Sequence, residues 1–291
     1  MSAACSGDWI LVLDHDEELS LEWQEPRWRE ILHRDEFTHF WLQRRWLTPS
    51  GNFIDCEPWW PDWQMRLYRN RPGEISPPRQ LHERIRVRGA GAHLRTLAIH
   101  HHDLRVASRS AREEKVASYE RLKPGEGLGY YYLFEDRNPP ESALPDRSDF
   151  ELEREILRMP ELSPEEVQAL SLRAQPPPDR LRPGELVWVE VELRNRSARV
   201  LCCGSPFPLN LSYHWLEAST RAIALFDGIR TSIVPALPPG TRGRRKMFVK
   251  APLAEGSYLL QLTMVQENLR WLESDCPELV REFSVTVHGD G

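Results

Sequence analysis

An acidic segment near the start of the chain carries the residues best suited to chemistry. Asp14 and Asp16 are one residue apart and are followed directly by Glu17 and Glu18. Carboxylate oxygens are preferred ligands of hard divalent cations, and such a cation can neutralise the charge on a diphosphate. Acidic pairs are also common in surface turns. The segment by itself therefore leaves a metal site and a solvated turn as alternatives.

The residues before these acids indicate where they would lie. A continuous apolar run from Trp9 to Leu13 precedes Asp14. Such a short, unalternating run is typical of a strand buried on both faces of an α/β sheet. Open α/β sheets bind ligands beyond the carboxyl ends of their strands. The sequence therefore predicts that the acidic segment lies at the ligand-binding edge of an α/β domain.

Further elements are expected to complete this first domain. Ser20 can cap a helix over residues 21–33, in which Pro26 is tolerated only within the first turns. Another helix is expected to begin behind a serine and to end before a Pro-Gly pair. Strand-like segments are expected between these two helices. The expected strands cover residues 37–46, 64–68 and 94–99, and the second helix covers residues 110–122.

Four segments resemble motifs of one enzyme family, in the family's order. The segment Gly7–Leu19 reads GDWILVLDHDEEL and resembles the acidic segment of family-2 glycosyltransferases with a GT-A fold. Asp62–Arg69 resembles the D-x-Q-x-R-L-F-R strand of that family, and Leu81–Glu83 resembles its V-H-E motif. Ile99–Tyr119 resembles its H-x-D…K-x-x-x-Y stretch. The nearest relatives would be enzymes that build lipopolysaccharide and other surface glycans.

The resemblance implies an inverting, metal-dependent transfer of a sugar from a nucleotide-sugar donor to a glycan or lipid-linked glycan acceptor. It places Mn²⁺ or Mg²⁺ and the donor diphosphate at Asp14 and Asp16, with His100 as a further metal ligand. A general base must deprotonate the acceptor hydroxyl. The matching acidic residue is Glu83, with Glu17 as the alternative. His100 has a second interpretation, as a histidine packed where a strand meets a loop.

Three kinds of side chain are candidates for substrate binding. His82 precedes Glu83 and would orient its carboxylate. Arg66 and Arg69 would contact phosphate, although on an alternating strand one of the two is expected to face solvent. Trp60 and Trp63 would stack on a sugar acceptor, or belong to the core or to a loop.

The resemblance begins partway through the family domain. Family members open with a strand, a Y-N-E turn and further βα units that hold uracil and ribose, and no such segment precedes Asp8 in this sequence. The chain is therefore expected to be a truncated or decayed enzyme with little or no turnover. This expectation raises the alternative of a non-catalytic carbohydrate-binding or scaffolding protein.

The second half of the chain shows a different pattern. Residues 137–180 form a Pro-rich connector with helical stretches, and Ser163 to Glu166 carry a serine cap, a first-position proline and the glutamate of a capping box. From Leu186 onward apolar and polar residues alternate with period two, and short strands are separated by turn signals. This pattern predicts an antiparallel β-sandwich over residues 181–288.

The order of motifs in this half resembles an immunoglobulin-like module of bacterial glycan-synthesis enzymes and the glycan-recognition domain of O-antigen export ATPases. It is carried by segments such as Asn210–Trp215 and Val265–Trp271. Aromatic faces stack on pyranose rings. His214, Trp215 and Trp271 are therefore candidates for a carbohydrate platform, and for Trp215 a position in the core is the alternative.

Composition narrows the class of protein. The chain has 291 residues, a hydrophobic fraction of 40% and a net charge of −6, so it is a globular protein without the basic surface of a nucleic-acid binder. The basic segment Arg242–Lys246 alternates like a strand and is interpreted as a solvated strand edge rather than a binding patch. The five cysteines are an odd number and cannot form a complete set of disulfides, which predicts reduced thiols in the cytoplasm. No segment is apolar enough to span a membrane.

Taken together, the sequence predicts an α/β, partial GT-A-like domain over residues 1–136, the connector over 137–180, and an all-β immunoglobulin-like sandwich over 181–288. The predicted activity is hexosyltransferase-like, with the non-catalytic binding protein as the alternative.

Overall fold

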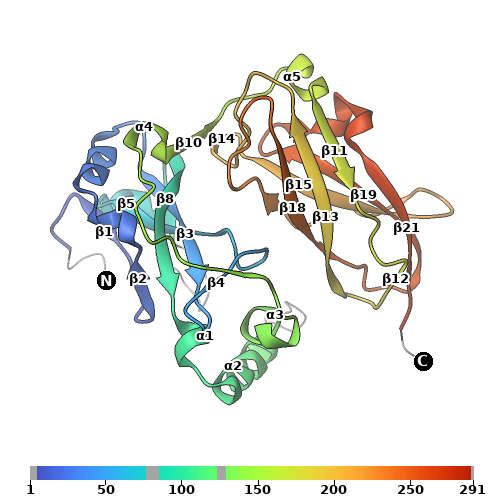
Figure 1. The fold of residues 1–291 in the computed structure, drawn as a ribbon, viewed down its shortest axis with the longest axis horizontal. Helices are drawn as coiled ribbons and strands as arrows, with labels where there is room; N and C mark the ends of the chain where they lie inside the picture. Colours follow the sequence, from blue (N-terminus) through green and yellow to red (C-terminus); the bar gives the residue numbers. More distant parts are fainter. Residues whose placement is uncertain (1–4, 77–84, 123–128, 290–291) are drawn as a thin grey trace. The chain divides into compact units, whose positions relative to one another are not determined.

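A computed structural model describes residues 5–76, 85–122 and 129–289 and separates into two compact units, Met1–Leu157 and Arg158–Gly291 (Figure 1). Strands make up 41% of the structure and helices 20%. The predicted α/β class of the first domain is therefore wrong: the protein is mostly β, with several sheets. An α/β sheet needs helices that cover its faces, and in the described residues the one α-helix longer than five residues, Arg109–Leu122, buries only Arg112.

The main sheet of the first unit is mixed. Its strands follow the order β1-β5-β3-β8-β10, and β2 pairs with the end of β8. β3 runs parallel to β8, whereas the β1–β5, β5–β3, β8–β10 and β2–β8 pairs are antiparallel. The strand bounds are β1 (Trp9–Leu11), β2 (Glu17–Leu19), β3 (His39–Trp46), β5 (Asp62–Arg69), β8 (Gly91–His101) and β10 (Ile156–Met159).

The position of β1 differs from the sequence prediction. β1 is a terminal strand of the sheet and pairs antiparallel with β5, with Trp9 opposite Arg69 and Leu11 opposite Leu67. Ile10 is buried, whereas Trp9 and Leu11 are only partly buried. The apolar run is thus an edge strand rather than one buried on both faces, and the side chain of Leu13 beyond it is 38% exposed.

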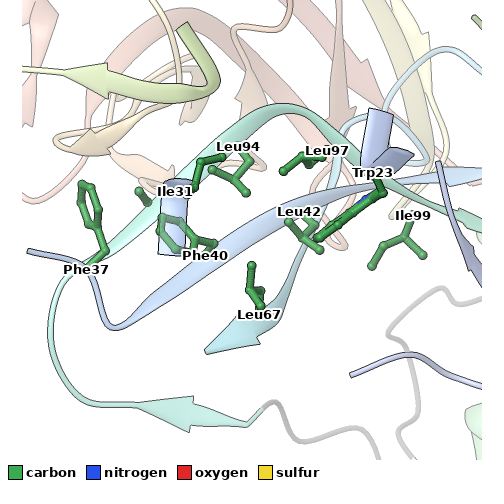
Figure 2. Close-up of a cluster of buried hydrophobic side chains, with 10 residues drawn as sticks. Trp23, Ile31, Phe37, Phe40, Leu42, Leu67, Leu94, Leu97 and Ile99 are labelled. Carbon is green, nitrogen blue, oxygen red and sulfur yellow. The ribbon is translucent and has the colours of Figure 1, made fainter. Parts of the chain in front are cut away.

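A buried cluster lies against β3, β5 and β8 and forms the core of the first unit (Figure 2). Two 3₁₀ segments, η2 (Leu21–Gln24) and η3 (Pro26–His33), replace the single α-helix expected over residues 21–33. Pro26 explains the difference, because its missing N–H and fixed φ interrupt an α-helix. The Trp23 indole N–H donates to the carbonyl of Ala98 over 2.9 Å and fixes η2 on β8. The cluster comprises Trp23, Ile31, Phe37, Phe40, Leu42, Leu67, Ala92, Leu94, Leu97 and Ile99.

The helices of the first unit contribute little to this core. α2 (Arg109–Leu122) begins one residue before the predicted start, ends where predicted, and buries only Arg112. It packs beside α3 (Gly129–Tyr132) beyond the end of β8 (Figure 1). α4 (Leu152–Glu155) is fixed by Glu155, whose buried carboxylate accepts hydrogen bonds from the amides of residues 96 and 97. The remaining short elements are β4 (Phe53–Ile54), β6 (Ile75–Ser76), β7 (Arg86–Val87), β9 (Glu141–Ser142), α1 (Asp103–Val106), η4 (Pro72–Glu74) and η5 (Phe134–Asp136).

The second unit contains two sheets with the strand orders β11-β13-β18 and β12-β21-β19-β15-β16. Tyr213 and Trp215 of β15 each hydrogen-bond the backbone of Lys250 at the end of β18, so the two sheets face each other. This arrangement agrees with the predicted period-two alternation. The bounds are β11 (Leu170–Ala174), β12 (Arg180–Leu181), β13 (Leu186–Asn195), β15 (Leu209–Glu217), β16 (Ile223–Leu225), β18 (Arg242–Lys250), β19 (Gly256–Gln266) and β21 (Arg281–Val287).

Shorter elements complete the second unit, and its first residues belong to the predicted connector. α5 (Pro164–Gln168) begins at Ser163 with the predicted capping box formed to Glu166. β11 then pairs with β13 over five residues, so the end of the predicted connector is part of the sandwich. The other elements are β14 (Ser205–Pro206), β17 (Thr231–Ser232), β20 (Arg270–Trp271), η6 (Leu272–Ser274) and η7 (Pro277–Leu279). Across the described ranges, no helix has the length and apolar character required to cross a bilayer.

Candidate functional site

The predicted acids lie in a turn between β1 and β2, fixed by backbone hydrogen bonds. The amide of Glu17 donates to the carbonyl of Asp14 over 3.1 Å, and β2 then places Glu17 opposite His101 and Glu18 opposite His100 on β8. β5 brings arginine and aspartate side chains to the same turn. We call this group the acidic turn cluster; it comprises Asp14, Asp16, Glu17, Glu18, Arg44, Asp62, Arg66, His100, His101, His102, Asp103 and Lys115.

Glu17 is the structural centre of the cluster. Its side chain is 0% exposed and lies 2.7 Å from Arg66 Nη2 and 3.2 Å from Arg44 Nη1. Its second oxygen accepts the amide N–H of Asp14 over 3.0 Å. Arg44 also binds Asp62 over 2.7 Å, which links the two strands β3 and β5. Both oxygens of the Glu17 carboxylate are therefore occupied, and this geometry suits a positioning residue better than a free general base.

The three predicted metal ligands have separate partners. Asp14 pairs with Arg66 over 2.5 Å, and Asp16 lies 3.3 Å from Nε2 of His101. His100 has another partner, since its Nδ1 lies 3.4 Å from the carboxylate of Glu18. In the part of the chain that the structure describes, no three His, Cys, Asp or Glu side chains are grouped to hold a metal ion. The arrangement therefore does not fit the predicted divalent cation, which remains a sequence-based prediction.

The electrostatics of the cluster are dominated by neutral imidazoles. Burial, followed by the nearby cations of Arg44, Lys115 and Arg66, lowers the pKa of His101 to about 2. Burial, followed by Arg45, also lowers the pKa of His100. At neutral pH these two rings are uncharged, and they act toward the carboxylates only as N–H donors.

Several buried polar atoms of the cluster lack a hydrogen-bond partner within the described residues. They are Arg66 Nε, His101 Nδ1 and Asp103 Oδ2. Asp103 is only 8% exposed, although its other oxygen binds Lys115 over 3.0 Å. Buried polar groups are almost always paired in folded proteins, so each such atom needs an explanation. A polar ligand with donors and acceptors at the turn would supply these partners.

The other predicted substrate residues are packed against the first unit itself. Trp60 lies edge-on to Phe53 at 5.3 Å and carries the Arg45 guanidinium 5.2 Å from its ring centre. Trp63 lies edge-on to His93 at 4.7 Å, and its buried indole nitrogen has no partner within the described ranges. His82 and Glu83, the predicted orienting residue and base, lie outside the described residues.

The His93 side chain provides a pH prediction for the first unit. Burial, followed by repulsion from His39, lowers the pKa of His93 to about 4 from 6.5. In the unfolded chain His93 has its ordinary pKa, so the unfolded state binds a proton more readily than the folded state. The free energy of unfolding is therefore unaffected by His93 above about pH 6.5 and decreases as the pH falls from 6.5 toward 4. We expect the loss to total about 3 kcal/mol over that range.

Urea unfolding of the wild type and of His93→Asn at several pH values measures this contribution. The variant is expected to lose stability less steeply between pH 6.5 and 4 than the wild type, by about 1.4 kcal/mol per pH unit. Parallel slopes for the two proteins would contradict the assignment to His93.

A second candidate region lies on the larger sheet of the second unit. The rings of His214 and Phe226 stack at 4.7 Å, and the ring of Trp271 lies 4.2 Å from His214 and 5.3 Å from Phe226. Arg230 lies 5.0 Å from the centre of the Trp271 ring. Phe226 is 50% exposed, whereas His214 is 5% exposed. We call Phe226, Trp271, His214 and Arg230 the sandwich aromatic cluster.

Carboxylates hold the polar members of the sandwich aromatic cluster in place. Arg230 binds Asp227 and Glu267, each over 2.6 Å. Nε2 of His214 lies 3.0 Å from Glu273. Burial by itself would raise the pKa of Glu273, but hydrogen bonds from His214 and Thr263 lower it below its usual value. The cluster thus combines a partly exposed aromatic surface with ordered charged groups.

The structure brings together His214 and Trp271 of the predicted carbohydrate platform, but it places Trp215 in the core. Trp215 is 0% exposed and donates its indole N–H to the carbonyl of Lys250 over 2.9 Å, so it is a core residue that no ligand can reach. His214 is buried and packs against the rings of Phe226 and Trp271. Only Trp271 retains a partly exposed ring.

Phe226 and Arg230 were not predicted from the sequence. Both flank the Asp227-Gly228 turn, and Gly228 lies where an added Cβ would come within 2.5 Å of the Tyr213 carbonyl. The Asp227-Gly228 pair is a turn signal in the sequence, but it does not indicate which neighbouring side chains lie at the surface.

Comparisons with known proteins do not assign this chain to a family. No family model matches the sequence, and no curated protein matches it. Among solved structures, the chain is similar over 41% of its length to a β-glucosidase from Listeria innocua in complex with glucose, at 16% identity and a TM-score of 0.29. The chain covers 16% of that enzyme.

Two further structures are similar at the same level. A CARDB domain from Pyrococcus furiosus in complex with di-metal ions matches 41% of this chain and 86% of its own, at 17% identity and a TM-score of 0.26. The sporulation control protein Spo0M of Bacillus subtilis matches 41% of this chain and 48% of its own, at 15% identity and a TM-score of 0.23. Similarities this low support no statement about activity.

Proposed function

We propose that the chain transfers a sugar from a nucleotide-sugar donor to a surface-glycan or lipopolysaccharide-type acceptor, in the cytoplasm, through the acidic turn cluster. The observation that carries the proposal is the set of unpartnered buried atoms Arg66 Nε, His101 Nδ1 and Asp103 Oδ2 around a turn rich in charge. The motif order along Gly7–Tyr119 supports the same activity. The five cysteines, an odd number, cannot all form disulfides within one chain, which fits a reducing compartment.

The chemistry assigned to this chain's own residues is electrostatic. When the bond from the sugar to the diphosphate breaks, negative charge grows on the departing diphosphate, and fixed cations stabilise that charge. Arg66, Arg44 and Lys115 are the cations of the cluster. Asp14 is 51% exposed, so a phosphate oxygen can replace its carboxylate on Arg66. The acceptor hydroxyl loses its proton to a carboxylate as its oxygen bonds the sugar, and Glu83 remains the predicted base.

Calorimetric titration of UDP and a UDP-sugar, with and without Mn²⁺, tests the donor site. Without Mn²⁺, we expect an Asp14→Ala, Asp16→Ala variant to bind about tenfold more tightly, ~1.4 kcal/mol, because the donor phosphate no longer competes with the Asp14 carboxylate for Arg66. Asp35→Ala is the matched control, because Asp35 is 95% exposed and pairs with an arginine outside the cluster. Absence of nucleotide binding in the wild type, or equal binding in all three proteins, would overturn the proposal. Dependence on Mn²⁺ would restore the predicted cofactor.

The second candidate function is non-catalytic carbohydrate binding through the sandwich aromatic cluster. The specific observation in its favour is the half-exposed ring of Phe226 beside Trp271, with Arg230 and its carboxylates at the edge. Sugar-binding surfaces combine an aromatic face for the ring with polar groups for the hydroxyls. Glycan binding that is lost in Trp271→Ala but is retained in Asp14→Ala, Asp16→Ala would favour this second function.

A further inference from the structure

The outer face of the β11-β13-β18 sheet is strongly cationic. Along β13, Val189, Val191 and Leu193 are buried, so the intervening side chains point outward. The register places outward residues of β18 beside them. The outward positions of the three strands carry six cations and two carboxylates, in a chain whose net charge is −6. These residues are Arg173, Arg194, Arg242, Arg244, Lys246 and Lys250, with Glu190 and Glu192, and Arg196 follows directly after the end of β13.

A groove of about 320 Å³ lies at one end of this face. Arg173, Arg194, Arg196 and Arg242 line it together with Glu192. The hydroxyl residues Ser171 and Thr241 complete the wall. We call this feature the arginine groove. Its volume is several times the roughly 30 Å³ that a water molecule occupies in the liquid, so it can take a phosphate group and part of its carrier.

The arrangement of charges in the arginine groove is unfavourable without a ligand. Arg194 on β13 lies directly opposite Arg242 on β18. Like charges opposite each other across antiparallel strands destabilise a sheet. Glu192 lies opposite both Arg173 and Arg244, and its carboxylate is 4.0 Å from Arg244. Within the described residues, none of the four lining arginines forms an ion pair of its own.

We propose that the arginine groove binds a phosphate group, carried by a diphosphate or a phosphate monoester. Guanidinium groups bind phosphate through two parallel N–H donors, which makes arginine the preferred side chain for this chemistry. A bound phosphate would convert the Arg194–Arg242 repulsion into two attractive contacts. The inference concerns the second unit and other residues than the acidic turn cluster, so it stands whether or not that cluster transfers sugars.

Calorimetry and thermal unfolding with pyrophosphate and with glucose 1-phosphate test this site, each against chloride at matched ionic strength. We expect both phosphate ligands to bind and to raise the Tm, and Arg194→Gln to weaken both by about tenfold. Tighter binding of glucose 1-phosphate would identify a sugar phosphate as the carrier, and tighter binding of pyrophosphate would identify a diphosphate. Arg242→Gln is expected to have the same effect as Arg194→Gln.

The control is Arg244→Gln, which removes the same charge from the same face. Arg244 is 84% exposed and does not line the groove. The ligand-free Arg194→Gln protein is expected to unfold at a Tm no lower than that of the wild type in low salt, because a repulsion has been removed. Equal weakening by Arg244→Gln would show only a diffuse surface potential and would overturn the site. Stabilisation by chloride equal to that by the phosphate ligands would also overturn it.

Discussion

Replacing Arg66 with glutamine should lower the free energy of unfolding of the first unit by about 3 kcal/mol. The side chain of Glu17 is completely buried and depends on Arg66 and Arg44 for its neutralisation. Removing one partner of a buried ion pair leaves the other charge buried and unpaired. The resulting loss of stability is much larger than the stability that the intact pair provides relative to apolar residues in the same place. The same variant should lose nucleotide binding, because Arg66 is one of the cations proposed to hold the donor phosphate.

Urea denaturation of the variant and of a double variant, Arg66→Gln with Glu17→Gln, measures the coupling between the two residues. The double variant is expected to be more stable than the sum of the two single losses predicts. Arg71→Gln is the matched control, because the Arg71–Glu74 pair is exposed and should contribute less than about 1 kcal/mol. Additive losses for Arg66 and Glu17 would contradict a direct ion pair.

The two tryptophans of the second unit should respond to substitution in opposite ways. Trp215→Ala is expected to cost about 3–5 kcal/mol, because it removes a fully buried ring and leaves the carbonyl of Lys250 without its indole donor. Trp271→Ala removes a partly exposed ring at the surface of the same sheet. Its cost should be about 1 kcal/mol, in the ordinary range for substitutions outside the core.

Thermal unfolding and glycan-array binding of both variants distinguish a core residue from a binding residue. If the second candidate function holds, Trp271→Ala should abolish array binding while the protein stays folded. Folded Trp215→Ala, measured below its Tm, should retain array binding. Retention of binding by Trp271→Ala would remove the sandwich aromatic cluster as a glycan surface.

Local patterns predicted many elements of this fold because their causes lie within a few residues. The helix at Arg109–Leu122 follows from a serine start and a Pro-Gly stop, and the capping box at Ser163 forms as expected. The alternation along Leu186–Asn195 correctly indicated a strand with one buried face. The fold class of the first half failed because an apolar run such as Trp9–Leu13 indicates a strand but says nothing of what covers it.

The contacts of the candidate site could not be predicted from the sequence, because they join residues that are far apart along the chain. Asp14 and Glu17 alone suggest a cation site, but Arg66 lies 52 residues from Asp14 in sequence and reaches its carboxylate only through the pairing of β1 with β5. His100 contacts Glu18, whereas Asp16 contacts His101, and the spacing of the motifs does not reveal this pairing. Phe226 was not predicted as a surface residue, because a single aromatic residue forms no periodic pattern that would indicate which way its side chain points.

The mixed order of the main sheet has a consequence for how the first unit assembles. β5 begins 16 positions after the end of β3, so these two strands can pair early, whereas Trp9 and Arg69 are 60 positions apart. Closing a long loop costs more entropy, and distant pairings form late. The turn that bears the acids follows β1, so its charges meet Arg66 and Arg44 only once the sheet exists. We therefore expect β3 and β5, which carry Arg44 and Arg66, to pair before the acidic turn reaches these arginines.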